Sequence, residues 1–216
     1  MKSFTGRKFL KHSIPLPAVS RLCALYQVLC DMHKEGVRTV SSAVLGERLG
    51  VGAHNVRKDV SFLSEAGSIG AGYEVEQLKK RIAAHFGFDR VKRTCVVGLG
   101  RLGSAILKQE RFSGGEFHIV AGFDSDINLV ETIMTGVEVF PAYEITDEVK
   151  RLKVEMGILT VPSSAAQESA ERLIRGGVKG IINFTPAVIR TEPPVVVRNV
   201  DLTSEFRVLS ALMYLN

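Results

Sequence analysis

TCVVGLGRLGSAI, residues 94–106, decides the fold of the second half of the chain. A short apolar run leads into three glycines spaced G-x-G-x-x-G, at Gly98, Gly100 and Gly103, and a helical pattern follows. In a dinucleotide-binding fold the first glycine permits a tight turn, the second lets the backbone approach a pyrophosphate, and the third lets helix and strand pack closely. The start of the helix supplies N–H donors and the positive end of its dipole. The predicted nucleotide loop also includes Leu99, Arg101 and Leu102.

An acidic residue at a fitting distance strengthens this interpretation. The apolar segment FHIVAGF, residues 117–123, predicts a second strand that ends at Asp124, which lies 21 positions after Gly103. A carboxylate at about this spacing accepts hydrogen bonds from an adenosine ribose. It would also repel a 2′-phosphate, which favours NAD over NADP. Asp126 is a rival acceptor, and a glycine-rich turn that serves packing alone is the alternative interpretation.

The remaining pattern of the second half alternates strands and helices. Strands are expected at 137–140, 155–161, 179–183 and 195–200, and helices at 143–152 and 163–176, the latter with a serine cap. This rhythm predicts a Rossmann-like, doubly wound α/β domain with a parallel sheet and helices on both faces. Ligands bind such sheets beyond the carboxyl ends of the strands. The expected cofactor-binding residues at those ends are Thr160, Val161, Pro162, Asn183, Phe184, Thr185 and Pro186.

The first half of the chain is basic. Residues 1–93 hold 16 Lys and Arg against 8 Asp and Glu, whereas residues 94–216 hold 12 against 15. The net charges are therefore +8 and −3, which sum to +5. This division favours a polyanion as the partner of the first half, although solvated surface lysines would give the same charge.

The basic half has the pattern of a winged helix-turn-helix. Helices are expected over 17–35, from Ser41 or Ser42 to Leu49, and over 53–65, with a glycine turn at 50–52. The second of these helices would place Val44, Leu45 and Leu49 inward. Gly67, Gly70 and Gly72 predict a tight hairpin, which would be the wing. A further amphipathic helix over 74–90 would end at Gly87, with 88–93 as a linker.

The second helix of a helix-turn-helix enters the major groove of DNA. Asn55 could there contact adenine, Arg57 could contact guanine, and Lys58 could hold a phosphate. The alternative is that Arg57, Lys58 and Asp59 form only the polar face of an amphipathic helix. The predicted DNA-binding residues are Ser41, Ser42, His54, Asn55, Arg57, Lys58 and Ser61.

The last predicted helix, DLTSEFRVLSALMYLN, begins at a capping Asp201 and is apolar on more than one side. Such a helix usually packs against two things, which could be its own sheet and a second subunit, including a swapped arrangement. Burial within its own chain is the alternative. The expected domains are a winged-helix domain over 1–90, a Rossmann-like domain over 91–200 and a C-terminal helix over 201–216.

Several classes of protein are disfavoured by what the sequence lacks. It has no apolar run of about 18 residues, as a membrane span would need, so we expect a cytoplasmic protein. Cys23, Cys30 and Cys95 are odd in number and widely spaced, which predicts neither a disulfide framework nor a metal site. The five histidines are scattered and no catalytic set can be assembled from them. We therefore expect the glycine loop to serve sensing and the protein not to be an enzyme.

Blocks spread over almost the whole chain resemble the Rex family of redox-sensing transcriptional repressors. They include IPLPAVSRL, EGVRTVSSAVLGERLGV, NVRKDVSF, GAGY, VVGLGRLGSA, LTVPSSAAQ, GVKGIINFTP and VRNVDL. The resemblance implies a homodimer that binds a palindromic operator through its winged helix. It also implies binding of NAD+ or NADH, with NADH favouring a closed form that releases the DNA, so that repression follows the NADH/NAD+ balance. The C-terminal helix would insert between the partner's two domains.

The resemblance extends to single positions. Arg57 and Lys58 match the basic pair of the family's recognition helix, and Asp124 matches its ribose acid. Arg21 matches an arginine that engages an aspartate of the partner's terminal segment, here Asp201. The residues expected at the switch or the subunit interface are Arg21, Asp201, Gln109 and Phe206.

Three positions depart from the family pattern. Ile69 stands where the family usually has a basic wing residue, so operator affinity or preference is expected to differ. Gln109 replaces a tyrosine of the nicotinamide-linked switch, and Leu202 stands where an aromatic residue often meets the nicotinamide. A Rex-like paralogue with altered sensing is therefore one alternative. A small NAD-dependent oxidoreductase and a CoA-binding module are the others.

Overall fold

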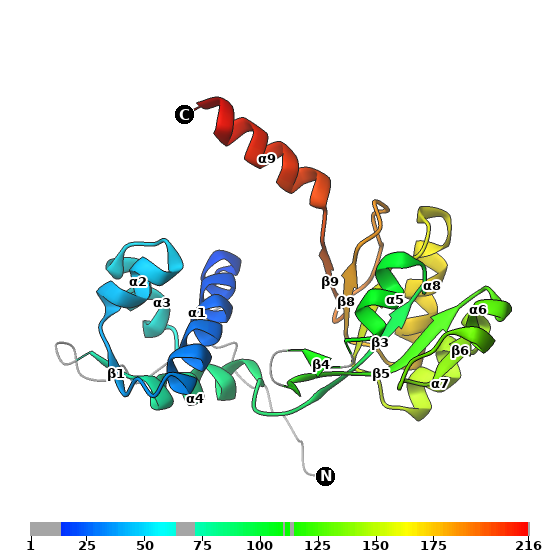
Figure 1. Ribbon diagram of the computed structural model, residues 1–216, viewed down its shortest axis with the longest axis horizontal. Helices are drawn as coiled ribbons and strands as arrows, with labels where there is room; N and C mark the ends of the chain where they lie inside the picture. Colours follow the sequence, from blue (N-terminus) through cyan, green and yellow to red (C-terminus); the bar gives the residue numbers. More distant parts are fainter. Residues whose placement is uncertain (1–13, 64–71, 110, 113–114, 216) are drawn as a thin grey trace, which may run out of the picture. The chain divides into compact units, whose positions relative to one another are not determined.

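A computed structural model describes residues 14–63, 72–109, 111–112 and 115–215. The chain divides into two compact units, Met1–Asp89 and Arg90–Asn216, called here the N-terminal and C-terminal units. Both are drawn in Figure 1. Within the described ranges, no helix combines the length and the apolar character needed to span a bilayer.

The described part of the N-terminal unit, residues 14–63 and 72–89, forms four helices and a short two-stranded sheet. The helices are α1 (Leu16–Lys34), α2 (Ser42–Leu49), α3 (Ala53–Ser61) and α4 (Val75–Phe86), and the strands are β1 (Thr39–Val40) and β2 (Tyr73–Glu74). The strands pair antiparallel, and β2 directly follows the segment predicted to be the wing. Gly67, Gly70 and Ile69 of that prediction lie outside the described residues. The core contains Leu22, Leu25, Leu29, Met32, Leu45, Val56, Val60, Leu78 and Ile82.

Local chemistry explains where these helices begin and end. The Ser41 hydroxyl accepts a hydrogen bond from the Val44 amide at 3.2 Å, so Ser41 rather than Ser42 caps α2. Gly50 ends α2 and Gly87 ends α4, both in the left-handed conformation that glycine adopts without steric cost. The helix after the turn is shorter than predicted, because α3 ends at Ser61.

Two predictions for this unit are wrong. Val44 is 42% exposed, because α2 turns the side between Leu45 and Gly46 inward and Val44 lies about 150° from the middle of that side around the helix. Residues 88–93 are not all linker. The Phe88 ring lies 5.0 Å from the Tyr26 ring, centroid to centroid, and the next strand already begins at Lys92.

The turn between α2 and α3 depends on a glycine with no room for a side chain. A Cβ atom on Gly46 would lie 2.5 Å from the Val51 carbonyl oxygen and 3.1 Å from the Ala53 amide nitrogen. The start of α3 therefore rests on the backbone of α2. This contact fixes the orientation of α3, whose exposed side carries the predicted DNA-binding residues.

The C-terminal unit is a seven-stranded, mostly parallel sheet. Its parallel strands are β3 (Lys92–Val97), β5 (Phe117–Asp124), β6 (Val139–Pro141), β7 (Met156–Leu159), β8 (Gly180–Asn183) and β9 (Val196–Asn199). Their order is β6-β5-β3-β7-β8-β9, which is the Rossmann order, and it reverses between β3 and β7. The short strand β4 (Arg111–Phe112) pairs antiparallel with the start of β5. The predicted Rossmann-like, doubly wound sheet is confirmed.

Helices cover both faces of this sheet. They are α5 (Arg101–Leu107), α6 (Ile127–Thr132), α7 (Ile145–Arg151) and α8 (Ser163–Gly176), with a 3-10 turn η2 (Ala142–Glu144) before α7. The last helix, α9 (Leu202–Leu215), follows β9 and has no buried residue, so it covers neither face. One core joins Val97, Phe123 and Leu159 to α7 and α8, and the other joins Val96, Ile119 and Ile158 to α5. Neighbouring residues of one strand thus face opposite layers.

Three details of the C-terminal unit differ from the predictions. Helix α6 was not predicted, because its six residues are too few to display a helical period. Strand β7 ends at Leu159, two residues earlier than expected. Pro162, and no serine, occupies the position before α8, where no side chain caps the helix.

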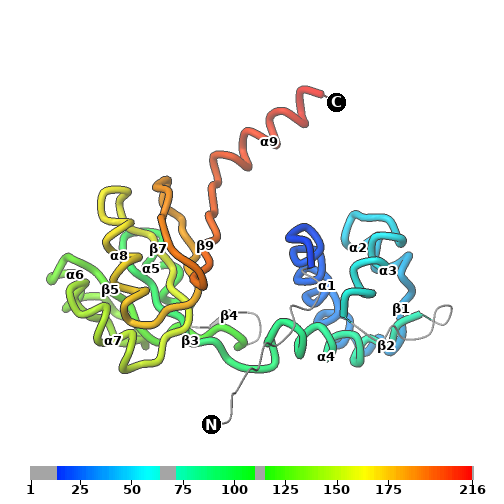
Figure 2. Tube along the Cα trace, turned by 180° about the vertical axis from the view of Figure 1, so that it is seen from behind, coloured from blue at the N-terminus to red at the C-terminus, as the bar shows by residue number. Residues whose placement is uncertain are grey.

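The chain runs from β8 to β9 through residues 184–195 without a helix, and then into α9 (Figure 2). The Asp201 carboxylate caps α9 as predicted, accepting hydrogen bonds from the Thr203 amide at 2.9 Å and the Ser204 hydroxyl at 2.6 Å. Every described residue of α9 is exposed. The helix is therefore not buried within its own chain.

Replacing Gly46 with alanine should destabilise the N-terminal unit. Alanine at an unhindered helix position is more stable than glycine, by about 1 kcal/mol. Here the new Cβ would overlap the Val51 carbonyl, so we expect a loss of about 1 to 3 kcal/mol. Thermal unfolding of the full chain followed by circular dichroism measures it. Glu47→Ala, at the exposed neighbouring position, is the control and should change stability by less than about 0.5 kcal/mol. A stabilised Gly46→Ala protein would contradict the close approach.

Candidate functional site

The predicted nucleotide loop is a turn that two of its glycines make possible. Gly98 has φ +90°, and its amide donates to the Phe123 carbonyl at 2.8 Å. A Cβ on Gly103 would overlap the Gly98 carbonyl oxygen. Gly100 differs from both, because a Cβ there would have no heavy atom of the described residues within 4 Å. The turn therefore leaves open space over the backbone at Gly100. This is the space that the second glycine of such a loop keeps for a pyrophosphate.

Thr160, which follows β7, fixes this turn from the neighbouring strand. Its hydroxyl points at the Gly98 carbonyl oxygen, 2.6 Å away, and lies 3.1 Å from the Val97 carbonyl oxygen. The single hydroxyl proton is thus engaged by the loop. Thr160 was predicted to bind the cofactor, and its described contacts are those of a residue that positions the loop.

Asp124 lies at the carboxyl end of β5 and holds the loop from the other side. One carboxylate oxygen accepts from the Leu99 amide at 2.5 Å, and the other accepts from the Asp126 amide at 2.8 Å. Each oxygen can accept a second hydrogen bond, so the carboxylate keeps acceptor capacity. The rival Asp126 turns its carboxylate to the start of α6, where it accepts from the Asn128 amide at 3.0 Å.

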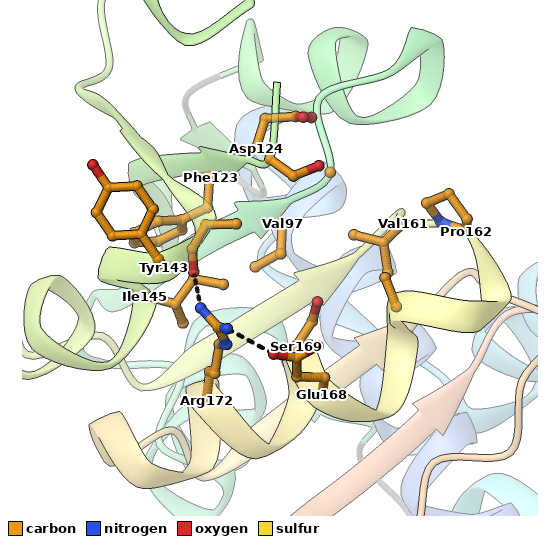
Figure 3. Close-up of a pocket in the computed structure, with 14 residues that line it drawn as sticks. Val97, Phe123, Asp124, Tyr143, Ile145, Val161, Pro162, Glu168, Ser169 and Arg172 are labelled. Carbon is orange, nitrogen blue, oxygen red and sulfur yellow. Dashed lines mark hydrogen bonds and ion pairs between the residues drawn. The ribbon is translucent and has the colours of Figure 1, made fainter. Parts of the chain in front are cut away.

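A cavity of about 310 Å³ opens beside Asp124, between the ends of the parallel strands (Figure 3). Its far side is formed by residues that sequence reasoning did not single out. The Arg172 guanidinium donates to the Ala142 carbonyl at 3.0 Å and to the Glu168 carboxylate at 2.6 Å. The sequence located α8 but gave no sign that its first turns line a cavity. The lining includes Gly98, Asp124, Tyr143, Pro162, Ser169 and Arg172.

Of the predicted cofactor-binding residues after β8, two are buried within their own loop and two are accessible from outside it. Asn183 is fully buried, and its amide donates to the Ala187 carbonyl at 2.8 Å and to the Asn199 side chain at 3.0 Å. Its oxygen accepts from the Thr185 amide and hydroxyl. Asn183 and Thr185 therefore shape this loop from inside. Phe184 is half-buried and Pro186 is exposed, so these two remain for contact with a ligand.

Strand register brings these segments to one edge of the sheet. Val97 pairs with Phe123 on one side and with Leu159 on the other, and Leu159 pairs with Asn183. The four residues form one row, so the segments that follow them begin at the same level. The loop at 98–103, Asp124 and the residues at 160–162 and 183–186 therefore share the carboxyl edge.

The other predicted surface is the exposed side of α3. His54, Asn55, Arg57, Lys58 and Ser61 are all exposed. The Arg57 guanidinium donates to the Ser42 hydroxyl of α2 at 2.9 Å, which joins two predicted DNA-binding residues. The Ser61 hydroxyl donates to the Lys58 carbonyl at 2.6 Å.

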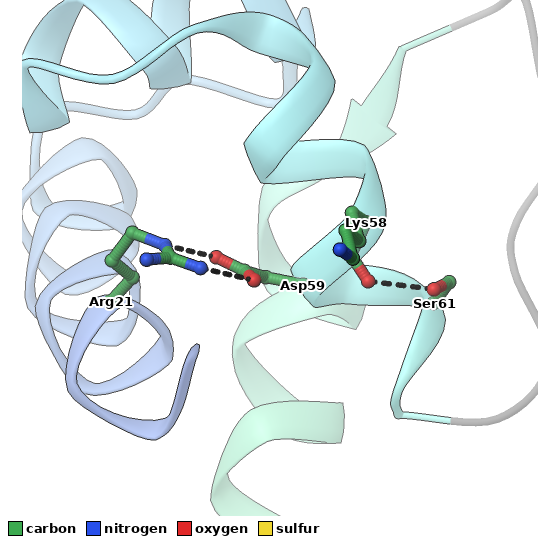
Figure 4. Close-up of polar contacts among 4 residues, drawn as sticks. All are labelled: Arg21, Lys58, Asp59 and Ser61. Carbon is green, nitrogen blue, oxygen red and sulfur yellow. Dashed lines mark hydrogen bonds and ion pairs between the residues drawn. The ribbon is translucent and has the colours of Figure 1, made fainter. Parts of the chain in front are cut away.

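Asp59 does not share the polar face with Arg57 and Lys58. It is only 3% exposed, because helical spacing places it with Val56 and Val60 on the buried side. Arg21 of α1 compensates its charge with two hydrogen bonds, of 2.6 and 2.8 Å (Figure 4). The hydrogen bond to Asp59 raises the Arg21 pKa, and this pair ties α3 to α1.

The predicted switch residues are engaged locally or exposed in a single chain. Arg21 bonds Asp59, and Asp201 bonds the first turn of α9, where the Ser204 hydroxyl lowers the Asp201 pKa. Gln109 is exposed just after α5, and Phe206 of α9 is 70% exposed. In the described residues, no three His, Cys, Asp or Glu side chains gather as metal ligands would.

Comparison with known proteins finds a matching family model for each half of the chain. Residues 89–187 match the model of a CoA binding domain, and residues 13–61 match a putative DNA-binding protein N-terminus. The redox-sensing transcriptional repressor Rex of Carboxydothermus hydrogenoformans is 38% identical over 197 residues, covering 91% of this chain and 95% of that protein. The Rex of Desulfitobacterium hafniense is also 38% identical, covering 91% and 94%.

Solved structures of a Rex-family repressor are also similar to this chain over nearly its whole length. The Rex-family repressor RSP in complex with β-NAD+ and operator DNA has a TM-score of 0.86 and 31% identity, covering 94% of both chains. RSP in complex with β-NADH has a TM-score of 0.82 and 30% identity, covering 93% of this chain and 94% of that one.

Cys95 should report whether the strand beneath the nucleotide loop opens. It lies in β3, and burial raises the pKa of its thiol to about 12, so almost no thiolate exists at pH 8. We expect a thiol reagent to modify the exposed Cys23 in the native protein and Cys95 only after unfolding. Mass spectrometry of the labelled peptides measures both rates. Native labelling of Cys95 at a rate near that of Cys23 would contradict a closed sheet.

Proposed function

This chain belongs to the Rex family of redox-sensing transcriptional repressors, and from that membership we propose that NADH releases it from operator DNA whereas NAD+ permits binding. The observation that carries the proposal is the open backbone cradle at Gly100 beside Asp124, in a chain that also exposes Arg57 and Lys58 on α3. One chain thus holds a dinucleotide cradle and a DNA-reading helix. We infer that it acts as a sensor and not as an enzyme.

The residues of the carboxyl edge fit an adenine dinucleotide. The pyrophosphate would lie over Gly100, where a Cβ would have open space. The adenosine ribose would donate to Asp124, whose two oxygens keep acceptor capacity. Asp124 would repel a 2′-phosphate, which favours NAD(H) over NADP(H). The nicotinamide half would extend toward 160–162 and toward Phe184 and Pro186. The bound dinucleotide supplies the redox-dependent signal through its nicotinamide ring.

The exposed side of α3 fits the major groove. Arg57 braced by Ser42 would read a guanine edge, and Asn55 an adenine edge. Lys58 would hold a phosphate, and His54, Ser41 and Ser61 lie on the surrounding surface. The Arg21–Asp59 pair would keep α3 in its reading orientation.

A second copy of the chain would cover α9. A helix without a buried residue that carries large apolar side chains would be costly to leave in water. We propose a homodimer in which α9 is swapped, with Arg21 engaging the partner's Asp201. Gln109 and Phe206 would belong to the contacts that change with the nucleotide. The functional domains would then be 1–90, 91–200 and 201–216, and the repressor would work in the cytoplasm.

The match of residues 89–187 to a CoA binding domain supports a second candidate ligand. CoA carries a phosphate on its adenosine ribose, which the Asp124 carboxylate would face. The negative charges of the carboxylate and of that phosphate would repel each other, so Asp124 favours a ligand with an unsubstituted ribose diol over CoA. CoA therefore belongs in the test as a competitor.

Operator binding in the presence of each nucleotide tests the proposal. Duplexes that the full chain retains are selected from a random pool with NAD+ present, and binding is then titrated with NADH, NAD+ or CoA. If NADH binds more tightly to the state that cannot hold DNA, it should weaken operator binding, and DNA should weaken NADH binding by the same factor. Such couplings are typically about 5- to 150-fold. Equal DNA affinity at all nucleotide concentrations would contradict the sensing function.

Arg57→Ala should weaken operator binding by about 1 to 3 kcal/mol and leave NADH affinity unchanged, because it removes one base contact of the N-terminal unit, whereas the nucleotide loop belongs to the C-terminal unit. Fluorescence anisotropy of a labelled duplex gives the DNA affinity, and calorimetry gives the NADH affinity. Arg175→Ala, an exposed position on α8, is the matched control. A DNA affinity equal to that of the control would mean that α3 does not read the operator through Arg57.

Two glycine variants separate binding from folding. Gly100→Ala should fold normally, because its Cβ has open space and its φ is −59°, yet fill the space of the pyrophosphate and abolish the NADH response. Gly103→Ala should destabilise the C-terminal unit itself, because its Cβ overlaps Gly98. Melting curves and NADH titrations distinguish the two. Undiminished NADH binding by Gly100→Ala would place the dinucleotide elsewhere.

A further inference from the structure

We propose that Glu168, with Ser169, selects the adenine base of the dinucleotide. Glu168 would accept a hydrogen bond from the exocyclic amino group, and the Ser169 hydroxyl would donate to the adjacent ring nitrogen. The inference rests on the proposed function, because it requires a dinucleotide whose ribose lies on Asp124. It goes beyond that function by naming what distinguishes adenine from other purines.

The cavity beside Asp124 has the form of a base-binding pocket. Val97, Ile145 and Val161 give it apolar walls, and it ends in polar groups of α8. Small-molecule sites typically combine such walls with a few placed polar groups. In a nucleoside the base is attached next to the ribose diol. A ribose on Asp124 therefore directs its base into the cavity that Asp124 lines.

Arg172 braces the polar end of this cavity. Its guanidinium donates to the Ala142 carbonyl at 3.0 Å and to the Glu168 carboxylate at 2.6 Å, and so connects α8 to the segment after β6. The Arg172 side chain is 29% exposed, whereas that of Glu168 is 66% exposed. The more buried Arg172 thus holds the carboxylate of the more exposed Glu168 at the rim of the cavity. Ser169 is 8% exposed, and its hydroxyl is directed into the cavity (Figure 3).

The chemistry of these groups matches adenine. Adenine presents an amino donor beside a ring-nitrogen acceptor, whereas guanine presents an oxygen acceptor at the equivalent position. Hypoxanthine has that same oxygen. An ionised carboxylate can only accept, and a hydroxyl can also donate. Glu168 would therefore bind the amino group and oppose the oxygen of hypoxanthine.

Glu168 could instead serve only to stabilise α8 through its pair with Arg172, and that role predicts a different result. Glu168 and Arg172 are four residues apart on one helix, and such pairs stabilise helices by a few tenths of a kcal/mol. If that were the whole role, replacing Glu168 would affect melting and leave base preference unchanged. Base preference is thus the readout that separates the two roles.

The test compares NADH with its hypoxanthine analogue, reduced nicotinamide hypoxanthine dinucleotide, by calorimetric titration of the full chain. A hydrogen bond to a charged group contributes about 1.5 to 3 kcal/mol, equivalent to about 10- to 140-fold in affinity. Because Glu168 is largely exposed, we expect a preference of about tenfold for NADH. In Glu168→Gln the side-chain amide can donate to the hypoxanthine oxygen, so the preference should fall to within about threefold.

Glu171→Gln is the matched control on the same helix. Glu171 accepts from Gln167 and does not line the cavity, so this variant should keep the wild-type preference. If Glu168→Gln fails to fold, Ser169→Ala replaces it and should lower NADH affinity and preference together. Equal affinity of the wild type for both dinucleotides, or an unchanged tenfold preference in the Glu168 variant, overturns the proposal and leaves the proposed function standing. Failure of the wild type to bind NADH at all overturns both.

Discussion

The structure depends on one constraint, which is the absence of room for a side chain at Gly103. The backbone of α5 lies so close to the Gly98 carbonyl that a Cβ would overlap it. Asp124 and Thr160 hold the same turn from the two neighbouring strands, through the Leu99 amide and the Gly98 carbonyl. The loop is therefore a rigid part of the sheet edge. An open space at Gly100 can persist only because the atoms around it are held on both sides.

The surface proposed to read DNA is built on a similar principle. Gly46 lets the start of α3 rest on the backbone of α2, and the buried Asp59 is tied to Arg21 of α1. The exposed side of α3 can then carry exposed positive charge, because its position is set by contacts on the opposite side. In both units a glycine and a buried or half-buried carboxylate fix the backbone, and the functional groups project from it.

Periodicity and glycine spacing were sufficient to predict most of the helices and strands and the Rossmann-like sheet, and they located the glycine turn at the carboxyl edge of that sheet. They could not predict which polar residues turn inward. Asp59 looks like part of a charged run, and only the partner contributed by α1 explains its burial. Asn183 follows a strand like a ligand-binding residue, yet its amide is consumed by its own loop. Arg172 and Glu168 line the cavity because of how α8 packs, which no local pattern encodes.

The adenosine end of the site has a consequence for what the protein measures. Asp124 is already fixed by the Leu99 and Asp126 amides, so a ligand meets a preformed carboxylate there. NADH and NAD+ have identical adenosine halves, so under the proposed function this end would anchor both without distinguishing them. The oxidised form would then compete with the reduced form for the same site. While the total pool stays well above both dissociation constants, such a receptor responds to the fraction of the pool that is reduced and not to the size of the pool.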